Sequence, residues 1–183
     1  MPSVVEFLCS QLYRKLPQPS EPFDGQTIII TGSNTGIGLE AARHFVRLNT
    51  AKVILAVRSL SKGEAAAASI EESTGRKDVV QVWELDLSSY GSVIRFVQRA
   101  NGLERVDAAM CNAGVMTYDF MLAEKDDINI TVNVVSTLLL GLLLIPKMRE
   151  TSVSFARETV LTFTGSLGHA AAEFPERKSK RIF

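Results

Sequence analysis

The chain has 183 residues, of which 46% are hydrophobic and 22% charged, values that fit a globular protein with one sizeable core and argue against a disordered, collagen-like or coiled-coil chain. Its 20 basic and 20 acidic side chains balance, so the net charge gives no reason to expect a nucleic acid or an anionic membrane as partner. No apolar run reaches the roughly 18 residues of a membrane span, and Cys9 and Cys111 lie too far apart for a metal motif. We therefore expect no membrane span and no metal site, and the lack of a disulfide framework favours a reducing, cytoplasmic setting.

Residues 1–24 differ in pattern from the rest of the chain. Apolar residues recur at helical spacing up to Leu16, and a proline-rich connector over residues 17–22 follows them. We expect an amphipathic arm that packs on the domain or is partly frayed. A helix lying on a membrane surface is the alternative, although its polar face is less basic than such helices need. Residues 25–183 then form one domain.

From residue 26 onward, apolar β-branched runs alternate with helical patterns. Strands are predicted over residues 27–31, 52–57, 79–85, 106–110 and 159–164. Helices are predicted over residues 39–48, 62–72 and 126–148, and a further helix begins after Ser88 or Ser89 as its N-cap. Gly75 is expected just beyond the second of these helices, as its terminator. The alternation indicates an α/β protein whose βαβ units form a doubly wound parallel sheet.

Three glycines lie in the turn between the first strand and the first helix. Gly32 lets the chain turn with a positive φ, Gly36 leaves room for a phosphate beside the backbone, and Gly38 permits close packing of the helix. The helix N-terminus adds unpaired N–H groups and a positive dipole end. Because the pattern lies between a strand and a helix of the first βαβ unit, it predicts a nucleotide site that holds a pyrophosphate.

This turn, with the spacing T-G-x-x-x-G-I-G, resembles the motif of the short-chain dehydrogenase/reductase family, classical type. Four further segments match that family in order: Leu85-Asp86-Leu87-Ser88, Cys111-Asn112-Ala113-Gly114 with Cys in place of the first Asn, Val132-Asn133-Val134, and Thr164-Gly165-Ser166. The resemblance covers residues 24–174, and residues 56–64 are closest to fungal members that modify secondary metabolites. It implies a Rossmann-type fold and an oxidoreductase that exchanges a hydride between a nicotinamide coenzyme and a small-molecule carbonyl or alcohol.

The end of the second strand bears on the choice of coenzyme. A carboxylate there usually binds the ribose hydroxyls of NAD, but in this chain Arg58 ends the strand and Lys62 follows four residues later. Two cations suit the 2′-phosphate of NADP, and a solvated loop pair is the alternative interpretation. Ser33 and Asn34 stand inside the turn, where NADP-preferring relatives often carry a basic residue. We expect NADP(H), with NAD(H) as the alternative.

The resemblance assigns further residues to the coenzyme. They are Ser33, Asn34, Ile37, Asp86, Leu87, Asn112, Ala113 and Gly114. Among these, Asp86 is implied to accept a hydrogen bond from the adenine amino group, Leu87 to pack near the ring, and Asn112 to hold the coenzyme side of the sheet. Simpler interpretations exist for two of them, because a carboxylate suits the helix start after Asp86 and an Asn such as Asn112 often forms turns.

For the chemistry, the resemblance implies a Tyr that supplies the proton, a Lys that lowers the pKa of that Tyr, a Ser that orients the carbonyl, and a helical Asn that anchors a water. Ser166 fits the Ser and Asn133 the Asn. The apolar neighbours of Asn133 predict a buried amide, which needs a water or a backbone group as partner. A purely structural Asn and an ordinary loop Ser are the alternatives.

The Tyr and Lys would be spaced Y-x-x-x-K, and none of the three tyrosines has a lysine four residues later. We interpret the chain as truncated before this motif, poorly active or inactive alone, and with a sheet that is incomplete on the C-terminal side. The apolar helix face over residues 138–144 would then be exposed, which favours a homo-oligomer or another association. Three hypotheses follow: an NADP(H)-dependent oxidoreductase, an inactive nucleotide-binding fragment or pseudoenzyme, and an interaction protein that pairs with a full-length relative.

Overall fold

A computed structural model describes residues 9, 12–13, 18–166 and 178 of the chain. Residues Pro22–Thr164 form one compact unit, which contains every strand and helix discussed below, and the described residues on either side belong to a second unit. The predicted amphipathic arm falls largely outside the described residues. Of its helical stretch only Cys9, Leu12 and Tyr13 are described, and all three are helical.

The core of the larger unit is a parallel sheet of five strands. These are β1 (Thr27–Thr31), β2 (Lys52–Val57), β3 (Val80–Glu84), β4 (Ala108–Cys111) and β7 (Val160–Phe163). Their order is β3-β2-β1-β4-β7, and every neighbouring pair is parallel. The chain therefore builds outward from β1 in one direction and then reverses at β4, which confirms the predicted doubly wound α/β fold.

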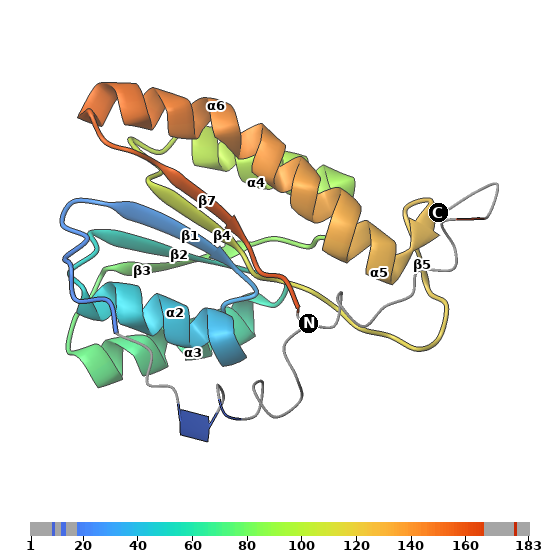
Figure 1. Cartoon of the computed structure of the whole chain (residues 1–183), viewed down its shortest axis with the longest axis horizontal. Helices are drawn as coiled ribbons and strands as arrows, with labels where there is room; N and C mark the ends of the chain where they lie inside the picture. Colours follow the sequence, from blue (N-terminus) through green and yellow to red (C-terminus); the bar gives the residue numbers. More distant parts are fainter. Residues whose placement is uncertain (1–8, 10–11, 14–17, 167–177, 179–183) are drawn as a thin grey trace. The chain divides into compact units, whose positions relative to one another are not determined.

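Helices cover both faces of this sheet (Figure 1). Helices α2 (Gly36–Arg47) and α3 (Leu60–Thr74) lie on one face, and α4 (Tyr90–Asn101) and α6 (Thr137–Phe155) lie on the other. Strand β1 is buried on both faces, because Ile28 and Ile30 belong to the core cluster under α2 and α3 while Ile29 belongs to the one under α4 and α6. This two-sided burial explains why the strand is a continuous apolar run.

The helix ends follow the local chemistry that predicted them. Gly75 ends α3 in the left-handed conformation with φ of 69°, and Ser89 caps α4 by accepting a hydrogen bond from the Ser92 amide at 3.3 Å. The last predicted helix, 126–148, is longer than expected and irregular. It comprises α5 (Ile128–Ile130), a π-helical segment η1 (Thr131–Ser136), and α6, and it passes Pro146 to end at Phe155. Because Pro146 and Leu142 are both exposed, water can satisfy the Leu142 carbonyl that the proline leaves without a donor.

The segment Ile128–Phe155 is also the most apolar helix of the chain. Its most apolar 18-residue window has a mean hydropathy of 2.2, which is enough for a membrane span by length and composition and which a count of uninterrupted apolar residues missed. In this fold it serves as a core helix, since Leu140, Leu144 and Met148 are buried against the sheet and α4. Only 39% of its most apolar window is buried, however, and Leu138 and Leu142 are exposed. The exposed apolar face predicted over residues 138–144 is therefore present.

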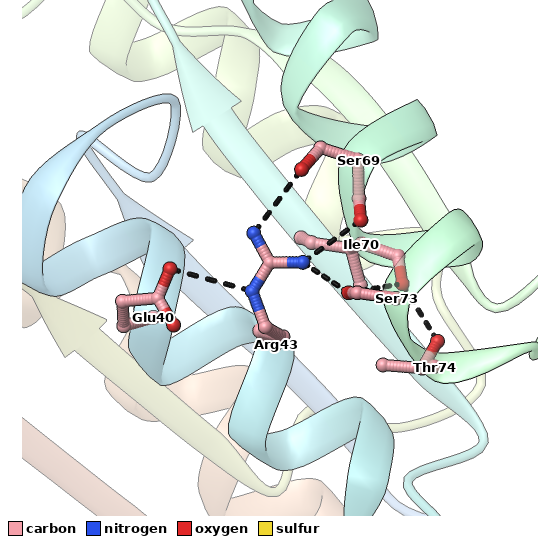
Figure 2. Close-up of polar contacts among 6 residues, drawn as sticks. All are labelled: Glu40, Arg43, Ser69, Ile70, Ser73 and Thr74. Carbon is pink, nitrogen blue, oxygen red and sulfur yellow. Dashed lines mark hydrogen bonds and ion pairs between the residues drawn. The ribbon is translucent and has the colours of Figure 1, made fainter.

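A buried arginine joins the two helices on the other face (Figure 2). Arg43 of α2 donates through Nη1 to the Ser69 carbonyl at 2.8 Å and to the Ser73 hydroxyl, and through Nη2 to the Ser69 hydroxyl at 3.2 Å. Its Nε donates to Glu40 at 3.3 Å. This contact ties α2 to the last turns of α3 on the face of the sheet that the two helices share. Nothing in the local sequence pattern around Arg43 predicts this contact.

Candidate functional site

The candidate site lies at the carboxyl ends of the strands, where the strand order reverses between β1 and β4. A first hollow is lined by the glycine turn, the segment after β2, the segment after β3 and the segment after β4. Its lining includes Gly32, Asn34, Arg58, Ser59, Lys62, Asp86, Leu87, Ala113, Gly114, Val115 and Val132. A second hollow shares Ala113 and Gly114 with it and adds Cys111, Asn112, Asn133, Leu138, Phe163 and Thr164. The two hollows are thus neighbours in one crevice, at the place where ligands bind in open α/β sheets.

The geometry of the turn explains why each of three positions is occupied by glycine. Gly32 has φ of 64°, and a Cβ there would lie 2.8 Å from the Ala113 Cα. Gly36 also has a positive φ, 58°, but the space beside it is open. A Cβ on Gly38 would lie 2.6 Å from the Asn112 Nδ2 and from the Gly32 carbonyl oxygen. Gly32 and Gly38 therefore let the turn pack on the segment after β4, and Gly36 leaves the outer side of the turn clear.

The start of α2 fits an anion. The first amide that bonds back along the helix is that of Leu39, which donates to the Thr35 carbonyl at 3.3 Å. The amides of Ile37 and Gly38 precede it in the first turn, where helix geometry leaves N–H groups without intrahelical acceptors. The Thr35 side chain makes no capping bond to them. A pyrophosphate placed beside Gly36 would meet these donors and the positive end of the helix dipole.

The other predicted turn residues are placed differently. Ser33 is fully buried, and its hydroxyl donates to the Ile30 carbonyl at 2.8 Å, so its side chain does not reach the hollow. Asn34 lines the first hollow. The side chain of Ile37 is 70% exposed and does not line either hollow.

Two cations face the first hollow from the start of α3. Arg58 and Lys62 are both exposed, both line the hollow, and neither forms an ion pair with any residue that the structure describes. Ser59, the N-cap of α3, lies between them in the lining and makes no capping bond. Ser59 was not among the predicted site residues, although its place directly after Arg58 at a helix start indicates it.

Asp86 faces the same hollow from the segment after β3. Its Oδ1 accepts hydrogen bonds from the Ser88 amide at 2.9 Å and the Ser88 hydroxyl at 2.7 Å. For Oδ2 no partner is found among the described residues, so this atom can accept a further hydrogen bond. Leu87 is buried beside it and lines the hollow. The bonds to Ser88 support the helix-start interpretation of Asp86 and leave one oxygen for a ligand as well.

Asn112 ties the end of β4 to the end of β1. Its amide and that of Ala113 both donate to the Thr31 hydroxyl at 2.9 Å, and its Nδ2 donates to the Thr31 carbonyl at 3.1 Å. The side chain thus holds the strand ends together and lines the second hollow. Ala113 and Gly114 follow it as the floor that the two hollows share.

Asn133 is exposed, so the prediction of a buried amide was wrong. Its position in the π-helical segment η1 turns it toward the loop after β4. There its Oδ1 accepts from the Val115 amide at 2.8 Å and its Nδ2 donates to the Val115 carbonyl at 2.7 Å. The expectation that a backbone group satisfies the amide is therefore met, by an extended loop segment. Asn133 lines the second hollow.

Ser166 completes the predicted set of site residues, and Cys111 precedes Asn112 in the same motif. Ser166 lies three residues beyond the end of β7, is exposed, and belongs to the second unit of the chain. Cys111, which stands where the family motif has its first Asn, is buried at the end of β4 and lines the second hollow. Burial raises the pKa of its thiol to about 11, so the group stays neutral at physiological pH.

A parallel sheet that reverses at β1 and β4, a glycine turn at the start of α2, and two cations without an ion-pair partner among the described residues define a Rossmann-type α/β fold, the kind of fold that binds dinucleotides. A family model described as short chain dehydrogenase matches residues 26–154. The chain belongs to the short-chain dehydrogenase family.

Fungal relatives and bacterial structures agree with this assignment. The chain is 45% identical over 181 residues to short-chain dehydrogenase anuD of Penicillium roqueforti, which covers 99% of this chain and 47% of that protein. It is 47% identical over 175 residues to short chain dehydrogenase/reductase dmxR8 of Cryptosporiopsis sp., covering 94% and 54%. A short chain dehydrogenase from Escherichia coli CFT073 complexed with NADPH has a TM-score of 0.67 and 29% identity, covering 81% of this chain and 62% of that one. The chain spans about half the length of the curated relatives that it matches.

Proposed function

We propose that the chain is the coenzyme-binding part of an NADP(H)-dependent oxidoreductase that acts on a small-molecule carbonyl or alcohol. The observation that carries the choice of coenzyme is the pair Arg58 and Lys62, which is exposed, without an ion-pair partner among the described residues, and part of the lining of the first hollow. A guanidinium can bind a phosphate through two parallel hydrogen bonds, and the ammonium of Lys62 adds a second charge. The NADPH-bound bacterial structure supports this choice.

The residues of the site then bind different parts of the coenzyme. The first-turn amides of α2 bind the pyrophosphate, Asp86 Oδ2 accepts from the adenine amino group, and Arg58 with Lys62 holds the 2′-phosphate. The shared floor of Ala113 and Gly114 supports the ribose between the two hollows. When bound, the nicotinamide supplies or accepts the hydride of the reaction. The fungal relatives, which carry names such as anuD and dmxR8, support a small molecule of secondary metabolism as substrate.

The spacing of the tyrosines favours a second candidate function, coenzyme binding with little or no catalysis. Tyr13, Tyr90 and Tyr118 are followed four residues later by Pro17, Ile94 and Leu122, so none can form the Tyr–Lys acid–base pair. General acid–base catalysis contributes about 10²–10⁴-fold to a rate. We therefore propose that the 183-residue polypeptide taken alone binds the coenzyme with little or no turnover, and that its exposed α6 face can pair with a full-length relative.

Titration of the 183-residue chain with NADPH and NADH, followed by fluorescence, tests the coenzyme. NADPH is expected to bind at least about ten-fold more tightly than NADH, which corresponds to about 1.4 kcal/mol. The double variant Arg58→Ala/Lys62→Ala should bring the two affinities together by weakening NADPH. The matched control is Arg47→Ala/Lys77→Ala, since both side chains are exposed and neither lines a hollow. Equal binding of both coenzymes by the native chain, or an equal effect of the control, would contradict the proposal.

A further inference from the structure

Residues 116–122 form a loop after β4 that ends at the first residue of strand β5 (Leu122–Ala123), and five large apolar side chains of this segment are exposed. Tyr118 is 93% exposed and Phe120 75%, and Met116, Met121 and Leu122 are exposed beside them. Aromatic residues seldom stand in water in such numbers within one short loop, and a contiguous exposed apolar group marks a contact surface. The family's turn motif and the coenzyme site account for none of these five side chains.

The base of this loop is fixed by hydrogen bonds from the helix start. Asn129 accepts from the Thr117 amide at 2.9 Å and donates to the Thr117 carbonyl at 3.2 Å. The Asp127 carboxylate accepts from the Asn129 side chain at 2.8 Å and from the Met121 amide at 3.2 Å, and the Ile128 amide donates to the Met121 carbonyl at 2.7 Å. These bonds hold Thr117 and Met121, at the two ends of the loop, against residues 127–129. The two aromatic side chains are thus presented from an ordered base, which lowers the entropy cost of binding through them.

The loop lies within reach of the crevice. The Asn133 side chain bonds to the backbone N–H and C=O of Val115, which lines the first hollow. The Asn129 side chain makes the same two bonds to Thr117, two residues further on. The two side-chain amides thus replace the backbone partners that a neighbouring strand would supply. Because an extended chain spans at most about 3.6 Å per residue, the Tyr118 Cα lies within about 14 Å of the Gly114 Cα, on the floor that both hollows share. None of residues 116–122 lines either hollow, so a molecule contacts the loop only if it extends beyond the shared floor.

The charges around the loop restrict what it can bind. Residues 116–127 contain four carboxylates, Asp119, Glu124, Asp126 and Asp127, against a single cation, Lys125. This negative field disfavours anionic lipid headgroups and anionic substrates. Two exposed aromatic side chains in an acidic setting fit a ring system without negative charge, which stacks on aromatic rings at centroid distances of about 4.5–7 Å.

We propose that residues 116–122 form a substrate-selecting arm that binds a ring-containing carbonyl compound without negative charge through Tyr118 and Phe120, with Asn129 as the positioning residue of the arm. This inference rests on the proposed oxidoreductase function, because the ring compound is its substrate. It adds the class of that substrate and the residues that select it.

The test uses 1-tetralone, a neutral bicyclic ketone, and the 183-residue chain saturated with NADP⁺, in which no hydride is available. Binding is followed by ligand-observed NMR. The variant Tyr118→Ala/Phe120→Ala should weaken 1-tetralone about ten-fold, the sum of two aromatic contacts. The matched control Ile94→Ala/Val153→Ala removes two exposed apolar side chains from α4 and α6 and should leave the affinity unchanged. Asn129→Leu should weaken 1-tetralone while the NADP⁺ affinity stays within about two-fold, a split that general unfolding would not give.

Two outcomes would overturn the inference. The first is equal 1-tetralone binding by the native chain and the Tyr118→Ala/Phe120→Ala variant. The second is binding of 1-naphthoate, an anionic ring compound, as tight as that of 1-tetralone. If the Tyr118→Ala/Phe120→Ala variant in the first case also loses self-association in sedimentation velocity, the loop is a contact between copies. If NADP⁺ and NADPH bind normally in these cases, only the substrate inference fails, whereas failure of the native chain to bind either coenzyme contradicts the proposed function itself.

Discussion

The Thr31 hydroxyl accepts two hydrogen bonds at 2.9 Å, from the amides of Asn112 and Ala113, and so joins the carboxyl ends of β1 and β4 at the point where the strand order reverses. The Asn112 side chain returns a bond to the Thr31 carbonyl. One threonine therefore holds together the two segments that form the phosphate side and the ribose side of the crevice.

Replacing Thr31 by valine should destabilise the protein. The shape is kept, but two amides at the strand ends lose their acceptor, and each such loss costs about 1–3 kcal/mol. Thr31→Ser keeps the hydroxyl and should retain most of the stability. Urea unfolding of the three proteins measures the difference, and equal midpoints for the valine and serine variants would contradict this role of the hydroxyl.

Arg43→Met should also lower stability, by about 1–3 kcal/mol, because it leaves the Ser69 and Ser73 acceptors in the α2–α3 interface without their donor. Arg47 lies four residues later on the same helix, is exposed, and provides the control Arg47→Met. Thermal unfolding measures both variants. A loss for Arg47→Met as large as for Arg43→Met would show that the buried contact is not the cause.

Because of Cys111, the stability of the folded protein should depend on pH in the alkaline range. Burial raises the pKa of its thiol from 9.0 to about 11, so between these values the unfolded chain loses this proton while the folded chain keeps it. The stability contributed by the neutral thiol is complete below pH 9 and is lost as the pH rises toward 11, by about 2–3 kcal/mol in all. Urea unfolding of the native chain and of Cys111→Ala across this range isolates the effect. Parallel pH curves for the two proteins would contradict it.

Asp127 gives the opposite dependence on the acid side. Hydrogen bonds from the Asn129 side chain and amide lower the pKa of this carboxyl from its ordinary value of 3.8. Its contribution to the ordered loop base is therefore present above pH 3.8 and is lost as the pH falls further. Hydrogen exchange of the Met121 and Asn129 amides should accelerate below this pH in the native chain, beyond the intrinsic trend. In Asp127→Asn this extra acceleration should be missing, and its persistence there would assign the change to another group.

Local sequence patterns were sufficient for the framework of the fold. The run of Ile28, Ile29 and Ile30 predicted β1 to the residue, because a strand buried on both faces needs apolar side chains at every position. The glycine turn was likewise readable, since a positive φ at Gly32 and close packing at Gly38 both require glycine.

The features that local sequence patterns did not predict depend on contacts between segments that lie far apart in the chain. Arg43 looks like any surface arginine until α3 is placed beside it, 26 residues away at Ser69. The apolar neighbours of Asn133 predicted burial, but the π-helical segment turns its amide to a loop 18 residues earlier. The Asn129 clamp on Thr117 was missed for the same reason, because nothing in the local pattern states which loop returns to the helix.

The central claim is that NADPH lies across the glycine turn with its 2′-phosphate between Arg58 and Lys62. The most direct measurement is a crystal structure of the 183-residue chain with NADPH. The account predicts the pyrophosphate on the amides of Ile37 and Gly38 and both cations within about 3 Å of the 2′-phosphate, the distance of a charge-assisted hydrogen bond. A coenzyme bound elsewhere, or a 2′-phosphate that faces solvent with Arg58 and Lys62 turned away from it, would contradict the claim.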